Sequence, residues 1–448
     1  MNSSSATSES HLPWAWICLA LLISASLHIA LQPGSLWTDE IASVKLAQQP
    51  VGLLWSDWMR RETNPPLYYT ILHYWMAEIG DSDTALRWLS WFCGAGAIVV
   101  AARLAVLLGN IRAGSVAALL VAVSPGHIVY CQEIRGYALG HTLALLALLG
   151  FAEFLRTDIG HGLRRANLAL YVIAASAAMY THTLLAILPP LVSLVFLFNA
   201  IVRGRWRELV LWLAANCIIL VLWAWWATIT WWQVRHPSNL SWLTRPPLWL
   251  ALRYVMEVYV SEGPGFIRAA VIAALGAGFL SGCAALRRGA DFVLPVVAVG
   301  VPILLYLLSW ATPVMLPRTV YWAQGAMAVT VAVGLMAARL GRLGTVLAAA
   351  LVAVGIGGAI SQHDKLEKEP WRRVVEILNA KAPGATVLAG GPHVAYLLAR
   401  YCGPPQCAFH IRTLVSPGET WSAGMPRPQP ILRNEVRKHT PKAAACFD

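Results

Sequence analysis

Charged residues are scarce in this sequence. Only 12% of its 448 residues are Asp, Glu, Lys or Arg, whereas 58% are hydrophobic, and the mean hydropathy is +0.58. An average soluble domain has about a quarter of its residues charged. This composition excludes an ordinary soluble protein. It predicts a polytopic membrane protein whose length suits many spans and one small domain.

Signatures of several other function classes are also missing. The 34 basic residues form no block with interleaved aromatics, so no nucleic-acid footprint is predicted. The 8 cysteines show no metal-ligand spacing. Residues 1–12 carry no Lys or Arg and no cleavage motif, so we expect the first apolar run to be retained as a span. Gly390-Gly391-Pro392 lacks the glycine spacing and the lysine of a phosphate loop.

Long apolar runs recur through the first 361 residues. A helix needs about 20 predominantly apolar residues to cross a bilayer. The runs lie near 14–32, 89–108, 112–124, 137–155, 166–181, 183–201, 209–229, 266–286, 291–310, 319–338 and 343–361. They predict an all-α membrane domain over residues 1–361 with about 11 transmembrane helices.

Basic residues mark one set of connections between these runs. They are Arg103, Arg112, Arg156, Arg164, Arg165, Arg203, Arg205, Arg207, Arg287, Arg288, Arg339 and Arg342. The positive-inside rule places this set in the cytoplasm, together with the N-terminus. The loop after the first span, the loops at 125–136, 230–265 and 311–318, and the C-terminal tail are then extracytoplasmic. Trp231, Trp232, Trp242 and Trp249 cluster in the long loop, as interfacial aromatics do.

Residues 362–448 form a compositional break. Helix-like Pro370–Ala380, a strand-like stretch at 385–389 and helix-like His393–Tyr401 predict a small extracytoplasmic α/β domain. Cys402 and Cys407 have the spacing for a short disulfide if this tail is extracytoplasmic. The last thirty or so residues, which include Cys446, are rich in proline and predict irregular structure.

Two adjacent carboxylates, Asp39 and Glu40, follow the first span. Charges at a membrane surface are costly unless they are used or solvated. One carboxylate is enough to take the proton from an acceptor in an inverting glycosyl transfer, and the pair is also suited to a divalent cation. A solvated acidic loop is the structural alternative. No cofactor is required by the sequence, and a divalent cation on these two residues is the one candidate.

Further polar groups fall on the same predicted membrane face. Glu133 and Arg135 lie together before one span, where they either contact substrate or pair with each other. His182 ends another span, as a ligand or as a structural hydrogen-bonding residue. Arg318 begins a span on the outer face, where its guanidinium suits a phosphate. Snorkelling to lipid headgroups is the alternative for Arg318.

The order of these motifs resembles that of the GT-C superfamily of membrane glycosyltransferases, and within it the protein O-mannosyltransferase and lipid A aminoarabinose transferase group. The matching stretches are Trp37-Thr38-Asp39-Glu40, Asn64-Pro65-Pro66-Leu67-Tyr68-Tyr69, Ala85-Leu86-Arg87, Ser124-Pro125, Gln132-Glu133-Ile134-Arg135-Gly136-Tyr137 and Tyr180-Thr181-His182. The resemblance covers residues 14–200 well and the Arg318 region loosely. Asn64 stands where the family usually has His, and Thr319 where Tyr often follows the arginine.

The resemblance implies a hexosyl or pentosyl transferase that uses a polyprenyl-phosphate-linked sugar at the periplasmic face of the inner (plasma) membrane. The acceptor is then a lipid, a glycan or a protein. Asp39 is implied as the catalytic base, with Glu40 beside it. The implied substrate-binding residues are Asn64, Pro65, Tyr68, Tyr69, Glu133, Arg135, Tyr137, His182, Arg318 and Tyr321. The amphipathic stretch 41–60 is expected to lie along the interface and roof the cavity.

A polytopic lipid or polysaccharide transporter, or flippase, is the main alternative, and a non-catalytic scaffold is the third. A transporter is expected to carry charges in mid-span or paired broken helices in two halves. The ionisable residues of this sequence collect at one predicted face instead, which favours the enzyme.

Overall fold

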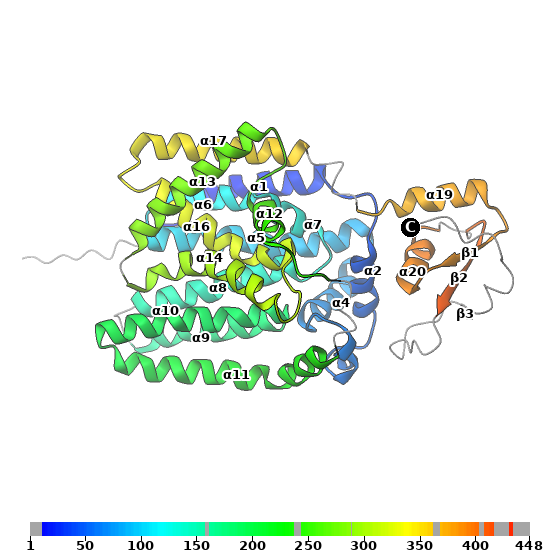
Figure 1. The fold of residues 1–448 in the computed structure, drawn as a ribbon, viewed down its shortest axis with the longest axis horizontal. Helices are drawn as coiled ribbons and strands as arrows, with labels where there is room; N and C mark the ends of the chain where they lie inside the picture. Colours follow the sequence, from blue (N-terminus) through cyan, green and yellow to red (C-terminus); the bar gives the residue numbers. More distant parts are fainter. Residues whose placement is uncertain are drawn as a thin grey trace, which may run out of the picture. The chain divides into compact units, whose positions relative to one another are not determined.

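The computed structural model describes residues 11–156, 161–236, 243–287, 289–361, 368–402, 407–415 and 430–432. Predictions for Arg288, Trp242, Cys446 and most of the proline-rich end lie outside these residues. The described chain is mostly helical, with a small sheet near the C-terminus (Figure 1).

Each of the eleven apolar runs contains a helix. The helices are α1 Trp14–Ala30, α5 Asp83–Leu108, α6 Ile111–Ala122, α8 Tyr137–Arg156, α9 His161–Met179, α10 Leu188–Arg203, α11 Trp206–Arg235, α13 Gly265–Leu286, α14 Val293–Leu308, α16 Gln324–Leu335 and α17 Gly341–Ser361. In the described part of the chain, 6 helices are long and apolar enough to cross a membrane, or up to 7 if a bent pair counts as one span. The predicted class, a multi-pass helical membrane protein, is confirmed.

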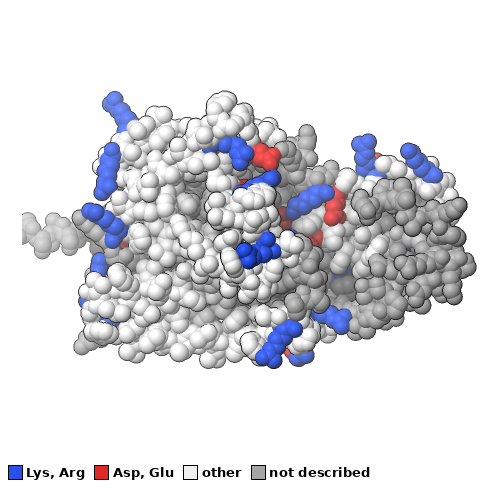
Figure 2. All heavy atoms as spheres, viewed as in Figure 1, with Lys and Arg blue, Asp and Glu red and all other residues white. Residues whose placement is uncertain are grey.

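The surface of these helices also fits a lipid environment. On α11, Leu220 and Val221 are 62% and 75% exposed. Figure 2 shows broad uncharged surface over the membrane helices, with Lys and Arg along the left edge of the view and in separate groups near its middle. In water such exposed apolar area would cost free energy, whereas lipid tails accept it.

The apolar runs 112–124 and 166–181 are each followed by a short helix rather than by an open loop. α6 and α7 (Pro125–Gln132) meet at an angle of 55°, because Ser124 is extended and Pro125 begins the second helix. α9 ends before His182, and the 3-10 helix η2 (Thr183–Ile187) follows. The region 230–265, which is predicted to be a loop, contains the helix α12 (Leu248–Tyr259). Its apolar residues recur at helical spacing after Pro247, which explains the helix.

The chain divides into two compact units, and each is described by itself. Unit 1 holds the described residues of Met1–Leu31, Glu62–Tyr68 and Arg87–His363, and unit 2 those of Gln32–Arg61, Tyr69–Leu86 and Asp364–Asp448. The division into a membrane domain of residues 1–361 and a C-terminal domain of residues 362–448 therefore stays a prediction.

Small residues allow close packing inside unit 1. A Cβ added at Gly334 on α16 would lie 1.9 Å from the carbonyl oxygen of Gly278 on α13, so glycine is required where these helices cross. Elsewhere the Trp212 ring packs between Phe151, Tyr171 and Phe196, with ring centroids 4.5 to 5.2 Å apart. The short elements η4 (Gly289–Phe292), α15 (Pro317–Val320) and η5 (Tyr321–Ala323) complete this unit.

Unit 2 contains the predicted α/β elements. Strands β1 (Thr386–Ala389), β2 (His410–Val415) and β3 (Pro430–Leu432) form a parallel sheet in the order β1-β2-β3. Helices α19 (Trp371–Lys381) and α20 (Pro392–Tyr401) pack with it around Val375, Ala389, Leu398 and Phe409. The same unit includes α2 (Thr38–Ala47), α3 (Val51–Leu54), η1 (Asp57–Arg61) and most of α4 (Leu67–Ile79).

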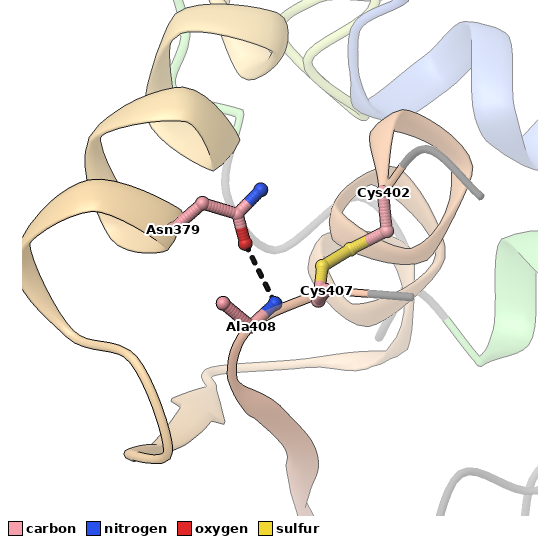
Figure 3. The surroundings of a disulfide bond; sticks show 4 residues. All are labelled: Asn379, Cys402, Cys407 and Ala408. Carbon is pink, nitrogen blue, oxygen red and sulfur yellow. Dashed lines mark hydrogen bonds between the residues drawn. A yellow bond between two sulfur atoms is a disulfide. The ribbon is translucent and has the colours of Figure 1, made fainter. Parts of the chain in front are cut away.

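A disulfide joins Cys402, which follows α20, to Cys407 before β2, with Cα atoms 5.0 Å apart (Figure 3). The next residue, Ala408, donates its backbone N–H to Oδ1 of Asn379 on α19 at 2.9 Å (Figure 3). The pairing that the cysteine spacing allowed is confirmed. It ties the end of α20 to the start of β2.

Candidate functional site

Arg135 is the buried centre of the polar cluster in unit 1. It is 7% exposed, and its Nη2 lies 3.9 Å from Oε1 of Glu62. The same Glu62 oxygen accepts from the backbone N–H and the side-chain amide of Asn64, each at 3.2 Å. Gln233 donates to the Glu62 carbonyl at 2.6 Å. The residues before Pro65 are therefore fixed against the α7–α8 connection that carries Arg135.

Three sequence motifs meet beside this pair. The Leu67 N–H donates to the Tyr180 carbonyl at 3.1 Å, and Tyr68 shares a hydrogen bond of 2.8 Å with Ser90. A Cβ added at Gly136 would meet Thr181 at 2.8 Å and Tyr68 at 3.2 Å. Because residue 136 is glycine, the segments 64–68, 133–137 and 180–182 can come into contact. The sequence predicts these segments on the same face of the membrane.

His182 is held at the junction of these segments. Its Nδ1 accepts from the Leu184 N–H at 3.2 Å, and its ring lies 6.0 Å from that of Tyr137. Burial, with smaller contributions from the charges of Arg135 and Arg318, lowers the pKa of His182 to about 3. The imidazole is therefore neutral near pH 7. Because Nδ1 accepts, the proton lies on Nε2, which makes Nε2 a donor.

Arg318 belongs to the same electrostatic neighbourhood. It is half-buried in the first turn of α15, directly after Pro317. Its charge acts on His182 and on Tyr130, whose ring lies 5.5 Å from Tyr137. Thus Arg135, His182 and Arg318, predicted from distant parts of the sequence, share one region of unit 1.

Tyr321, which is predicted as a substrate contact, lies between two histidines. It is fully buried, and its hydroxyl lies 3.0 Å from Nδ1 of both His127 and His141. This hydroxyl can donate to one ring and accept from the other, so it joins α7, α8 and η5. Neither histidine is predicted from the sequence, because a single histidine in an apolar run gives no distinctive pattern.

Asp39 and Glu40 lie in unit 2, at the start of α2. Glu40 is 2% exposed, and its Oε2 accepts from the Trp37 N–H at 3.1 Å. It therefore caps the helix, whose N-terminus favours a carboxylate. Asp39 is half-buried, so the adjacent carboxylates differ in environment. Tyr69 also falls in unit 2 and is 2% exposed.

The carboxylate pair does not fit a two-ligand metal site. Successive residues of a helix point about 100° apart, and Glu40 already satisfies the helix end. Over the described ranges, no group of three or more His, Cys, Asp and Glu could hold a metal ion.

A separate cavity of about 380 Å³ opens in unit 1. Most of its lining is apolar, with residues from α13, α16 and α17. Tyr259 and Gln324 also line it, and among the described residues the Tyr259 hydroxyl and the Gln324 Oε1 atom have no hydrogen-bond partner. The cavity suits a mainly apolar ligand that offers a polar group.

No protein-family model matches this chain, and no curated protein matches it. Solved structures are similar. The crystal structure of ArnT from Cupriavidus metallidurans in the apo state has 13% sequence identity and a TM-score of 0.65, over 90% of this chain and 86% of that one. The same protein bound to undecaprenyl phosphate gives a TM-score of 0.66 at 13% identity, over 95% of this chain and 91% of the other.

A second type of enzyme is also similar. The Archaeoglobus fulgidus oligosaccharyltransferase tethered with an acceptor peptide has 15% identity and a TM-score of 0.56. The match covers 83% of this chain and 57% of that one. At such identities the similarity concerns the fold alone. The fold of this chain is that of ArnT and of this oligosaccharyltransferase, as the resemblance in motif order predicts.

Proposed function

We propose that this protein transfers a sugar from a polyprenyl-phosphate-linked donor to a lipid, glycan or protein acceptor. The observation that carries the proposal is that Arg135 and Arg318, both in unit 1, lie near enough to His182 for their charges to act on it. Guanidinium groups beside a neutral imidazole suit a phosphate. The ArnT structure of similar fold contains undecaprenyl phosphate, which supports a lipid-linked phosphate as the ligand.

The reaction is an inverting displacement at the anomeric carbon. The acceptor oxygen or nitrogen attacks this carbon, and the bond from the carbon to the phosphate oxygen breaks. The electron pair leaves with the lipid phosphate, whose negative charge the two arginines stabilise. Asp39 takes the proton of the acceptor as general base. Nε2 of His182 donates a hydrogen bond to a phosphate oxygen.

The lipid part of the donor binds in the apolar cavity of unit 1. Gln324 lines this cavity and is three residues from Tyr321, at the end of the Arg318 segment. A chain of prenyl units matches the apolar lining. Asn64, Pro65, Tyr68, Tyr69, Glu133 and Tyr137 complete the substrate-binding set, with Asn64 and Glu133 supporting the arginine cluster.

The site faces the extracytoplasmic side of the inner membrane, as does the C-terminal α/β domain of residues 362–448. The Arg-rich connections support this orientation, because they mark the cytoplasmic side. A divalent cation remains an optional partner of Asp39 alone, since Glu40 caps its helix.

A transporter of lipid-linked sugars is the second candidate. The broken pair α6 and α7, bent by 55°, is the observation that favours it, because broken helices line transporter sites. Among the described helices this is the one bent pair that passes the span criteria, whereas a transporter of two repeated halves is expected to have two.

Purified protein in liposomes tests the two functions against each other. A panel of undecaprenyl-phosphate-linked hexoses and pentoses is supplied with lipid, glycan and peptide acceptors. A transferase releases undecaprenyl phosphate and forms a new glycoside. Movement of intact donor between leaflets without release would overturn the proposal in favour of transport. Arg318→Ala is expected to lower the release of undecaprenyl phosphate, and Arg253→Gln, on an exposed pair with Glu257, is the matched charge-removal control.

A further inference from the structure

The segment that leads into Asp39 is held by residues from the other end of the chain. Glu369 accepts the backbone N–H of Thr38 at 3.1 Å and the Thr38 hydroxyl at 3.0 Å. The ammonium of Lys368 lies 3.8 Å above the Trp37 ring. Both residues of the motif before Asp39 are thus contacted by the start of the C-terminal segment, within unit 2.

The three residues before Trp37 are held in the same way. Arg372 donates its backbone N–H to the Ser35 hydroxyl at 3.1 Å and its Nε to the Gly34 carbonyl at 2.6 Å. The Leu36 N–H donates to the Tyr401 hydroxyl at 2.6 Å. Every residue from 34 to 36 therefore bonds to α19 or α20.

Asp83 connects these contacts into one cluster. It is 9% exposed and accepts from Tyr401 at 2.7 Å, from Arg372 at 2.9 Å and from Nε of Arg400 at 2.8 Å. Burial raises the pKa of the Tyr401 hydroxyl, so the hydroxyl stays protonated and can donate to Asp83 while it accepts from Leu36. Two guanidinium groups compensate the buried carboxylate, and a network satisfied in this way is rigid.

We propose that this cluster, defined as Asp83, Glu369, Arg372, Arg400 and Tyr401, positions Asp39 for catalysis. The inference rests on the proposed role of Asp39 as base and extends it to residues that do not touch substrate. Asp39 directly follows Thr38, and its helix α2 begins at Thr38. Fixing residues 34–38 therefore fixes the start of the helix that carries the carboxylate. Catalytic groups need such support, because an error of about 1 Å can cost 100-fold in rate.

Two conservative variants test the positioning role. Tyr401→Phe removes the hydroxyl between Leu36 and Asp83, and Glu369→Gln keeps the shape but weakens the bonds to Thr38. Each is expected to lower kcat by roughly 10-fold or more while KM for the best donor of the panel changes little. Tyr74→Phe, at a 59% exposed tyrosine of the same unit, is the matched control and is expected to act like wild type.

A double-mutant cycle separates positioning from simple loss of stability. If Tyr401 acts through Asp39, Tyr401→Phe has little further effect on kcat once Asp39→Asn is present. If the double variant loses kcat by the product of the two single-variant factors, the inference is overturned. If Asp39→Asn alone turns over like wild type, the assignment of the base fails instead, so the two failures are distinguishable.

Hydrogen exchange provides a readout that does not depend on activity. The amides of Leu36 and Thr38 are bonded to Tyr401 and Glu369, so peptides covering residues 34–40 are expected to exchange faster in both variants and at the wild-type rate in Tyr74→Phe. Unchanged exchange in both variants would overturn the inference even if no donor of the panel were used.

Discussion

Arg135 and Glu62 form an ion pair of 3.9 Å in which the side chains are 8% and 21% exposed. The carboxylate offsets the charge of an arginine that is otherwise costly to bury. It also joins the segment before Pro65 to the α7–α8 connection. Arg135 and Arg318 are therefore expected to differ, because Arg135 has a structural role as well as a role in phosphate binding.

We predict that Arg318→Ala weakens donor binding as well as turnover. The guanidinium contacts phosphate in the ground state and in the transition state, so its loss should cost about 2–4 kcal/mol in donor affinity. Titration with an undecaprenyl-phosphate-linked sugar measures the change, and Arg318→Lys should recover part of it. Normal donor binding by Arg318→Ala would make this arginine a headgroup anchor and leave Arg135 as the main phosphate contact.

Substitutions at the two adjacent carboxylates should have different effects. Asp39→Asn keeps the shape but removes the basic oxygen, so we predict that kcat falls by roughly 100-fold while donor binding is kept. Glu40→Ala removes the acceptor of the Trp37 N–H at the start of α2, so it should mainly lower stability, by about 0.5–2 kcal/mol. Steady-state kinetics and thermal unfolding measure the two effects. Wild-type turnover by Asp39→Asn would direct attention to Glu40 or Glu133 as base.

The neutral state of His182 predicts a pH dependence of stability. The pKa of His182 is lowered in the folded protein to about 3 from an ordinary value of 6.5. Below pH 6.5 the unfolded chain therefore binds the proton first, and stability falls by roughly 1.4 kcal/mol per pH unit toward pH 3. His182→Gln should lose less between pH 7 and pH 5 in thermal unfolding. Equal losses in both proteins would contradict this account.

The disulfide gives a prediction for the C-terminal unit. Replacing both cysteines in Cys402→Ser/Cys407→Ser should lower the stability of this unit by about 2 kcal/mol, as expected for a short loop. Cys217→Ser, at an exposed free cysteine, is the control. Thiol labelling of denatured, unreduced protein should find Cys402 and Cys407 blocked. Labelling of both would mean that the native protein lacks the bond.

Orientation in the membrane can be measured directly. Reporter fusions after Arg207 and after Lys381 should report opposite sides, because the Arg-rich connections are expected in the cytoplasm and the tail outside. Reports from the same side would overturn the predicted number of spans.

The sequence predicted those features that depend on local patterns. Apolar runs were sufficient to locate the membrane helices, and the end of the run 112–124 located the end of α6, whereas the helix α7 falls in a predicted loop. The order of the motifs also predicted His182 and Arg135 in one region. This agrees with the close approach of Gly136 to Thr181.

Long-range partners could not be predicted in this way. Glu369 bonds to Thr38 across 331 positions, and neither residue has a neighbour that signals the pairing. Glu62 is not among the predicted site residues, although it is the ion-pair partner of Arg135. For His127 and His141, the bonds to Tyr321 depend on how three separate elements pack. Such contacts are set by tertiary structure rather than by local sequence.

The discontinuity of unit 2 has a consequence for biosynthesis. Its early segments end at Leu86 and its last segment begins at Asp364, so roughly 280 residues must be made between them, which takes about 15–55 seconds at ordinary translation rates. During this interval the nascent chain exposes Asp83 without Arg372 or Arg400, and Thr38 without Glu369. The early segments of unit 2, from Gln32 to Arg61 and from Tyr69 to Leu86, therefore mature last, after the ribosome has completed the helices that follow them.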